Sequence, residues 1–188
     1  MKTMTLTIKG TRPLLLHSDT SCDPLSNSAV ELARMTKRRD KKTEDAQHEI
    51  ARAEWEAGLY FDEGGVYLPT WNVIRSIQDG ARMSKSGKLI ERGVTAIEDR
   101  AYFDLTSKVL DALWADPQYR DRRSVKVGTA RVIRTRPRIP TGWRLAIGLA
   151  YVETMIDESA IKEFANIAGA LIGVGDFRQR FGRYEVVS

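Results

Sequence analysis

The sequence is poor in the residues that build disulfides and zinc sites. Its 188 residues include one cysteine, Cys22, and two histidines, His17 and His48. A single cysteine excludes an internal disulfide, and one cysteine with two histidines cannot supply the usual Cys/His zinc set. Only carboxylates could then hold a metal ion. We therefore expect no metal site and no cofactor.

Long apolar runs are also missing. The longest is far shorter than the roughly 18 residues that a membrane-spanning helix needs. The N-terminus alternates Met4, Leu6 and Ile8 with polar residues, which is typical of a strand and not of a secretory signal. We expect a cytoplasmic protein without a membrane segment.

Recognisable enzyme motifs are absent as well. The sequence carries no phosphate-binding P-loop, no dinucleotide fingerprint and no identifiable serine–histidine–acid arrangement. Its composition, 42% hydrophobic and 29% charged, is that of a globular protein, and 188 residues fit a single domain. We expect one domain over 1–188 that is not an enzyme.

Positive charge is what the sequence has in excess. Lysine and arginine outnumber aspartate and glutamate by 30 to 25, which gives a net charge of +5. Between residues 120 and 144 a single acid, Asp121, stands among nine basic residues, which are Arg120, Arg122, Arg123, Lys126, Arg131, Arg134, Arg136, Arg138 and Arg144. Such a segment favours a polyanionic partner. The alternative is a solvated edge strand whose charges prevent aggregation.

The apolar periodicity predicts an α+β fold. We expect a first strand over 3–9, then a helical insertion over about 26–58 with caps at Ser26 or Asn27 and at Thr43. A short hairpin (59–62 and 66–68) precedes a helix over 70–83, capped by Thr70 and burying Trp71, Ile74, Ile77 and Ala81.

A short helix around 107–114 follows, and then two strands, 124–135 and 143–152, predicted to pair as a basic hairpin within about 120–152. A helix capped by Asp157 should bury Ile161, Phe164, Ala165, Ala168 and Leu171, and a last strand covers about 183–187. Without its insertions this order is the βαββαβ succession of ferredoxin-like and RNA-recognition folds.

A glycine-bearing loop precedes the last strand, within 173–187. Gly173 and Gly175 can adopt positive φ and expose backbone N–H groups, and the arginines between them and the strand fit phosphate bidentately. Those arginines are Arg178, Arg180 and Arg183, and Phe177, Phe181 and Tyr184 are interleaved with them. Aromatic faces stack on unpaired bases. The alternative is that the glycines only end a helix, Phe181 belongs to the core and the arginines form a solvated rim.

Three stretches resemble the RAMP (repeat-associated mysterious protein) superfamily, which supplies backbone subunits of CRISPR effector complexes, and small bacteriophage proteins. They are GVGDFRQRFGRYEV (173–186), VYLPTWNVIRSIQDGAR (66–82) and LLLHSDTSCDPLSNSAV (14–30). The resemblance implies a ferredoxin-like core, a glycine loop that approaches a nucleic-acid backbone, and copies that line up along the strand. A phage protein of this kind would act in the host cytoplasm.

The loop after the first strand offers the only catalytic candidates. In some RAMP subunits this loop bears an aspartate that cleaves RNA. Here Asp19 and Asp23 could hold a divalent ion or orient a 2′-hydroxyl, with His17 as base. Asp23 before Pro24 is equally an ordinary turn, Asp19 could cap local backbone donors, and His17 suits a strand end.

The sequence thus predicts a binder of single-stranded RNA or DNA that forms a homo-oligomer or filament. A protein that assembles with acidic partners and a metal-dependent ribonuclease using Asp19 or Asp23 remain alternatives. The predicted contact residues are Arg131, Arg134, Arg136, Arg138, Gly173, Gly175, Arg178, Arg180, Phe181 and Arg183.

Overall fold

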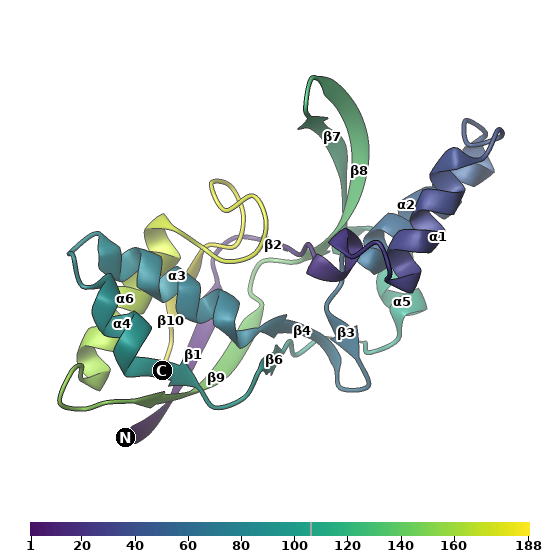
Figure 1. Ribbon diagram of the computed structural model, residues 1–188. Coiled ribbons are helices and arrows are strands. Elements are labelled where there is room, and N and C mark those ends of the chain that lie inside the picture. The colour runs from purple at the N-terminus through teal and green to yellow at the C-terminus, as the bar shows by residue number, and fades with distance from the viewer. Residues whose placement is uncertain (106) are drawn as a thin grey trace. The chain divides into compact units, whose positions relative to one another are not determined.

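The computed structural model describes residues 1–105 and 107–188. The fold mixes α-helices with antiparallel sheets (Figure 1) and divides into two compact units. Unit 1 comprises Met1–Leu14, Phe61–Lys108 and Pro140–Ser188, and unit 2 comprises Leu15–Tyr60 and Val109–Ile139. Over the described residues, no helix is both long enough and apolar enough to cross a membrane.

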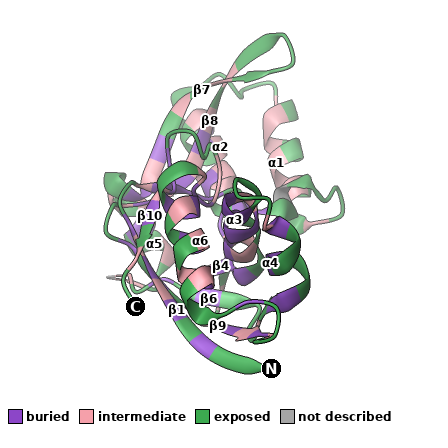
Figure 2. Ribbon diagram, turned by 90° about the vertical axis from the view of Figure 1, so that its left-hand side faces the viewer, coloured by how far each residue is buried: buried purple, intermediate pink, exposed green. Residues whose placement is uncertain are grey.

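Unit 1 is built on a four-stranded antiparallel sheet. Its strands are β1 (Lys2–Gly10), β5 (Val94–Ala96), β9 (Arg144–Tyr151) and β10 (Tyr184–Val186), in the order β10-β1-β9-β5. The two central strands pair from Lys2 opposite Tyr151 to Lys9 opposite Arg144. Met4, Leu6 and Ile8 alternate with exposed residues along β1 and are buried, so the predicted first strand is confirmed (Figure 2).

Helices cover the apolar face of this sheet. They are α3 (Thr70–Arg82), α4 (Gly87–Gly93) and α6 (Glu158–Leu171), and α3 packs closely on α6 (Figure 1). A Cβ at Gly80 of α3 would lie 2.8 Å from the Cβ of Ala168 on α6, so glycine permits the close approach. Asp157 caps α6 as predicted, since its Oδ1 accepts a hydrogen bond of 2.8 Å from Ala160 N.

Three details of these helices differ from the prediction. Thr70 is the first residue of α3 and not its cap, because its hydroxyl donates to the carbonyl of Glu98 at 2.7 Å. Ile77 and Ala81 are buried as predicted and Ile74 is half-buried, but Trp71 is 58% exposed and Val73 is buried instead. The predicted burial of Leu171 is also wrong, since it lies exposed at the end of α6.

A second, small sheet of unit 1 contains the predicted short hairpin. The strand β4 (Gly65–Pro69) pairs with β3 (Phe61–Asp62) on one side and with β6 (Arg100–Tyr102) on the other. Asp62 accepts hydrogen bonds from Gly64 N, Tyr102 Oη and the Arg100 guanidinium. These bonds hold the hairpin turn against β6.

Unit 2 combines a helical pair with a β-hairpin. Its elements after β2 (Leu14–Leu15) are η1 (Asp19–Cys22), α1 (Asn27–Lys37), α2 (Glu44–Ala57), α5 (Leu110–Ala115), η2 (Pro117–Tyr119), β7 (Arg120–Val127) and β8 (Ala130–Ile139). The predicted caps are confirmed, with Ser26 capping α1 and Thr43 capping α2. Trp55 of α2 is almost fully buried, and its Nε1 donates to the Tyr119 carbonyl at 2.8 Å.

The predicted pairing of 124–135 with 143–152 is wrong. The basic hairpin is β7 paired with β8, turning at Gly128 and Thr129, with Gly128 at φ +60°. Glycine at the first position of a two-residue turn suits the type II′ hairpin. The segment 144–151 is β9 of unit 1 because its buried Leu145, Ile147 and Leu149 join the same core as β1.

Candidate nucleic-acid interface

Two arginines in the lower half of the β7–β8 hairpin are paired with acids. Arg123 lies directly opposite Arg134, but each has an acid partner. Arg123 forms an ion pair with Asp121, and Arg134 Nη1 lies 2.6 Å from Glu54 Oε1 of α2. The other Glu54 oxygen accepts from Thr135 N at 2.9 Å, and the Glu54 side chain is only 9% exposed. Arg134 therefore anchors the hairpin to α2, which is a structural role that the sequence did not indicate.

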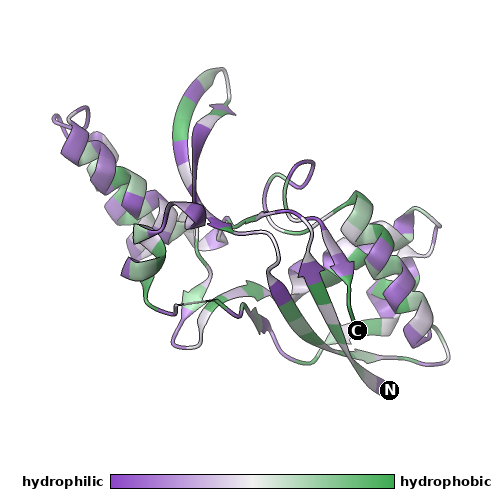
Figure 3. Ribbon diagram, turned by 180° about the vertical axis from the view of Figure 1, so that it is seen from behind, coloured by the Kyte–Doolittle hydropathy of each residue, from purple (hydrophilic) through white to green (hydrophobic). Residues whose placement is uncertain are grey.

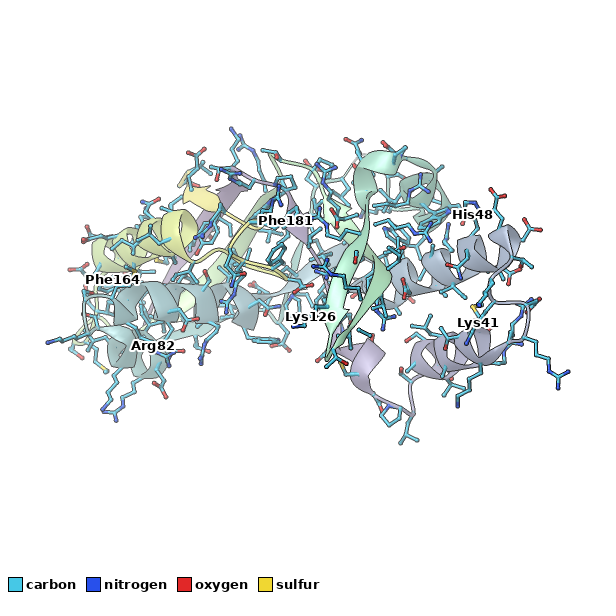
Figure 4. The ribbon with its side chains drawn as sticks, turned by 90° about the horizontal axis from the view of Figure 1, so that it is seen from above. Lys41, His48, Arg82, Lys126, Phe164 and Phe181 are labelled. Atoms are coloured by element: carbon cyan, nitrogen blue, oxygen red, sulfur yellow. The ribbon has the colours of Figure 1, made fainter. Side chains whose placement is uncertain are left out.

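The tip of the hairpin is different. Lys126 lies directly opposite Arg131, and no ion pair or side-chain hydrogen bond joins either to another described residue. Both are exposed, as are all residues from Lys126 to Arg131 (Figure 2; Lys126 is labelled in Figure 4). Like charges directly opposite each other on a sheet are destabilising. The tip thus presents two cations whose mutual repulsion no neighbouring acid relieves.

Figure 3 shows both hydrophilic and hydrophobic residues along the β7–β8 hairpin, and the strand register assigns them to two faces of different polarity. Ser124, Lys126, Arg131 and Ile133 share one face because directly opposite residues point to the same side. The other face carries Val125 opposite Val132 and Val127 opposite Ala130. The tip is therefore cationic on one side and apolar on the other.

The remaining predicted hairpin residues, Arg136 and Arg138, are half-buried. Arg138 Nη1 donates to the carbonyl of Gln118 at 3.1 Å, which fixes β8 to η2. Of the four predicted hairpin contacts, Arg131 is thus the most accessible.

The glycine loop of unit 1 is closed at its base. Gly173 (φ +83°) donates its N–H to the Ala168 carbonyl and ends α6, while Val174 N donates to the Gly182 carbonyl at 3.0 Å. Ser76 of α3 donates to the Gly173 carbonyl at 2.9 Å and lies 3.1 Å from the Tyr184 hydroxyl. Burial raises the pKa of Tyr184, against a smaller lowering by the Ser76 hydrogen bond. Gly173 therefore serves the fold, as the helix-ending alternative proposed.

The tip of the loop is presented to solvent. Gly175 (φ +76°) and Phe177 (φ +50°) both adopt left-handed backbone conformations, which turn the chain so that 177–180 are exposed. Phe177 is 43% exposed, and Arg178 and Arg180, which follow it in the chain, are exposed as well. An exposed aromatic ring and two exposed guanidiniums within four residues match the chemistry of an unpaired base with its phosphates.

Two predicted loop residues are less accessible to a nucleic acid. Phe181 is 6% exposed, and its ring centroid lies 5.9 Å from that of Phe177, so it packs under the loop (Figure 4). Arg183 is half-buried, and its Nη1 is buried without a hydrogen-bond partner among the described residues. Phe181 belongs to the core, as the alternative proposed, and Arg183 has only part of its guanidinium accessible.

The loop meets a charged cluster on α3 that sequence reasoning missed. Asp79 lies within ion-pairing distance of three arginines, with Arg75 Nε at 3.3 Å, Arg82 Nη1 at 2.8 Å and Arg178 Nη1 at 3.4 Å. The sequence did contain a signal for this cluster. Arg75 precedes Asp79 by four residues and Arg82 follows it by three, so the three side chains meet on one face of the helix. The cluster carries three positive charges against one negative charge.

The outward face of the four-stranded sheet is unsuited to base stacking. Among the described residues it presents the small side chains of Thr3, Thr5, Ala146, Gly148 and Ala150, and no aromatic ring. RNA-recognition folds stack bases on aromatic residues of their sheet. The glycine loop and α3 of unit 1, by contrast, each carry an exposed aromatic ring near exposed arginines.

The catalytic candidates lie around η1 of unit 2, with His17 before it, Asp19 at its start and Asp23 directly after it. His17, Asp19 and Asp23 are all exposed. Asp23 Oδ1 accepts a hydrogen bond from Leu25 N at 2.9 Å, which is the ordinary turn considered above. In the part of the chain that the structure describes, no group of three His, Cys, Asp or Glu residues could hold a metal ion.

The comparisons with known proteins add no assignment to these surfaces. No protein-family model matches this chain, and no curated protein matches its sequence.

Proposed function

We propose that this protein binds single-stranded RNA or DNA, without catalysis, through phosphate contacts. The observation that carries the proposal is the Lys126–Arg131 pair at the hairpin tip, which is repulsive within the protein and becomes favourable beside a polyanion. Arg123 and Arg134 lower on the same hairpin, by contrast, are each matched by an acid. The loop with Phe177, Arg178 and Arg180 supplies a separate contact suited to unpaired bases.

We also infer that unit 1 is a ferredoxin-like core related to the RAMP superfamily. The succession β1, α3, β5, β9, α6, β10 supports this inference once the small sheet and unit 2 are set aside, as does the strand order β10-β1-β9-β5. The glycine loop directly precedes β10, which is the position that the resemblance assigns to it.

Fluorescence anisotropy tests the proposal. Labelled single-stranded RNA, single-stranded DNA and duplex DNA of equal length are titrated with wild type and with Lys126→Ala/Arg131→Ala, over a series of salt concentrations. Each lost phosphate contact on a single strand reduces the slope of log K against log[salt] by about 0.7. We expect the double variant to lower the slope by about 1.4. A matched control, Arg34→Ala/Lys162→Ala, also removes two exposed cations, both from ion pairs within helices, and should leave the slope unchanged.

A second candidate function is assembly with other protein chains, including copies of this one. The apolar face of the hairpin tip favours it, because Val127 is 53% exposed beside Ala130 and Val132. Light scattering after nuclease treatment separates the two functions. Oligomers that persist without nucleic acid and dissociate in Val127→Ser/Val132→Ser support assembly through this face.

A further inference from the structure

Helix α3 presents an exposed tryptophan in line with two arginines. Trp71, Arg75, Asp79 and Arg82 occupy positions i, i+4, i+8 and i+11, which lie on one side of a helix with 3.6 residues per turn. The opposite side of α3 is buried against α6 through Gly80 and against the core through Val73 and Ile77. This polar face is therefore directed away from the core of unit 1.

Trp71 is more exposed than the other tryptophans, of which Trp114 is half-buried. Trp55 and Trp143 are buried, and each has its indole N–H bonded to a carbonyl, Tyr119 and Arg12 respectively. Trp71 is 58% exposed, although α3 itself has an apolar face on its opposite side that could have buried a tryptophan. A large planar ring left in solvent beside cations is the usual arrangement for stacking on an unpaired base.

Asp79 holds the arginine side chains close together. Its Oδ1 accepts a hydrogen bond from Arg82 and lies 3.3 Å from Arg75 Nε, and its Oδ2 accepts from Arg178 of the glycine loop. A guanidinium has five N–H donors, so each of these exposed arginines keeps donors that are free to bind phosphate. The net positive charge of the cluster also favours a second anion. Figure 4 shows where Arg82 lies at the end of α3.

We propose that the Trp71 face of α3 binds one nucleotide and its neighbours, with the base stacked on Trp71 and phosphates bound by Arg75 and Arg82. Along the helix axis Arg75 lies about 6 Å and Arg82 about 16.5 Å from Trp71, at 1.5 Å per residue. This inference rests on the proposed function and deepens it, because it names the partner of this face as a single strand. A duplex keeps its bases stacked on one another and offers only phosphates.

Base removal combined with the Trp71→Ala change tests the stacking. Anisotropy is measured with a labelled 15-residue oligouridylate and with an abasic oligomer of the same length and charge. We expect Trp71→Ala to weaken oligouridylate binding about 10-fold, within the range for one stacked base. Its binding to the abasic oligomer should not change, and Trp71→Phe should recover part of the loss. Phe61→Ala is the control, since Phe61 is an exposed aromatic residue on β3. An equal loss on both oligomers, or none on either, overturns the stacking role.

Arginine substitution tests the phosphate contacts. Arg75→Gln/Arg82→Gln should weaken binding to both oligomers equally and reduce the salt slope by about 1.4. The control Arg34→Gln/Lys162→Gln removes two cations from comparable ion pairs and should keep the slope. An unchanged slope in Arg75→Gln/Arg82→Gln overturns the phosphate role.

The outcomes separate this inference from the proposed function. If wild type binds neither oligomer at low salt, the proposed function fails and this inference fails with it. If wild type binds and Lys126→Ala/Arg131→Ala lowers the slope, but the α3 variants have no effect, only this inference fails.

Discussion

The repulsive pair at the hairpin tip predicts opposite effects on stability and on binding. In Arg131→Glu the residue opposite Lys126 becomes an acid, so a like-charge pair is replaced by an attractive one. Directly opposite pairs on a sheet contribute roughly 0.2–1 kcal/mol, and like charges cost a similar amount. We therefore expect the hairpin to gain about 0.5–1 kcal/mol against local opening, while affinity for single strands falls.

Native-state hydrogen exchange of the β7–β8 amides measures the local gain. A change of about 0.5–1 kcal/mol corresponds to a roughly two- to five-fold rise in protection, since 1.36 kcal/mol is tenfold. The rise should shrink at high salt, because both side chains are exposed and salt screens them.

Arg134→Glu is the control, three register positions lower on the hairpin, where Arg134 also lies opposite an arginine but has an acid partner. It places a carboxylate beside the nearly buried Glu54, so it should lower protection and stability instead. Unchanged or reduced protection in Arg131→Glu would refute the reasoning that the tip stores uncompensated repulsion.

Three further predictions concern the contacts that hold each unit together. Glu54→Ala leaves Arg134 and Thr135 N without their acceptor and should cost about 2–3 kcal/mol in urea unfolding, whereas the exposed Glu49→Ala should cost less than 1 kcal/mol. Gly182→Ala should destabilise far more than Gly128→Ala, although both have positive φ: a Cβ at Gly182 would lie 1.9 Å from the Val174 carbonyl oxygen, and one at Gly128 meets nothing within 4 Å. At Gly128 only the backbone strain of a positive φ remains, which costs about 1–2 kcal/mol. Equal losses of stability for the two variants in thermal melts would contradict the predicted clash at Gly182. Ser76→Ala should cost about 1–3 kcal/mol through its lost bonds to Gly173 and Tyr184, and a melting temperature equal to that of wild type would remove this role in fixing the loop.

Local signals in the sequence determined most of the individual elements. Alternation of Met4, Leu6 and Ile8 marked β1, and side-chain acceptors at Ser26, Thr43 and Asp157 marked the starts of three helices. These signals act over a few residues, so they can be recognised without knowing the tertiary fold.

Pairing between distant segments was harder to predict. The predicted strands 124–135 and 143–152 are adjacent in sequence, but the two-residue turn at Gly128 and Thr129 lies inside the first of them. That segment therefore folds back on itself, and residues 130–137 pair with 120–127. The second segment pairs with β1, more than 130 residues away, because both bury their apolar side chains in one core. The Gly128-Thr129 turn signal was present in the sequence. We predicted a single strand over 124–135 because its basic residues were interpreted as one continuous charged segment.

The candidate site shows the same limit. Composition located the basic hairpin and the glycine loop, but it could not tell which arginines have acid partners. Arg131 and Arg134 look alike in sequence, and only the position of Glu54 on α2 distinguishes them. Trp71 was predicted to be buried because its spacing to Ile74 and Ile77 fits an apolar stripe, yet Val73 takes the inward position.

Competition for the bound strand tests the central claim most directly. A labelled 15-residue single strand on wild-type protein is displaced in turn by unlabelled single strand, by duplex DNA and by polyglutamate of matched charge. We predict displacement by the single strand at the lowest concentration, since it alone offers both phosphates and unstacked bases. Equal displacement by polyglutamate would show a general acidic partner, and no binding of the labelled strand at low salt would contradict the nucleic-acid function altogether.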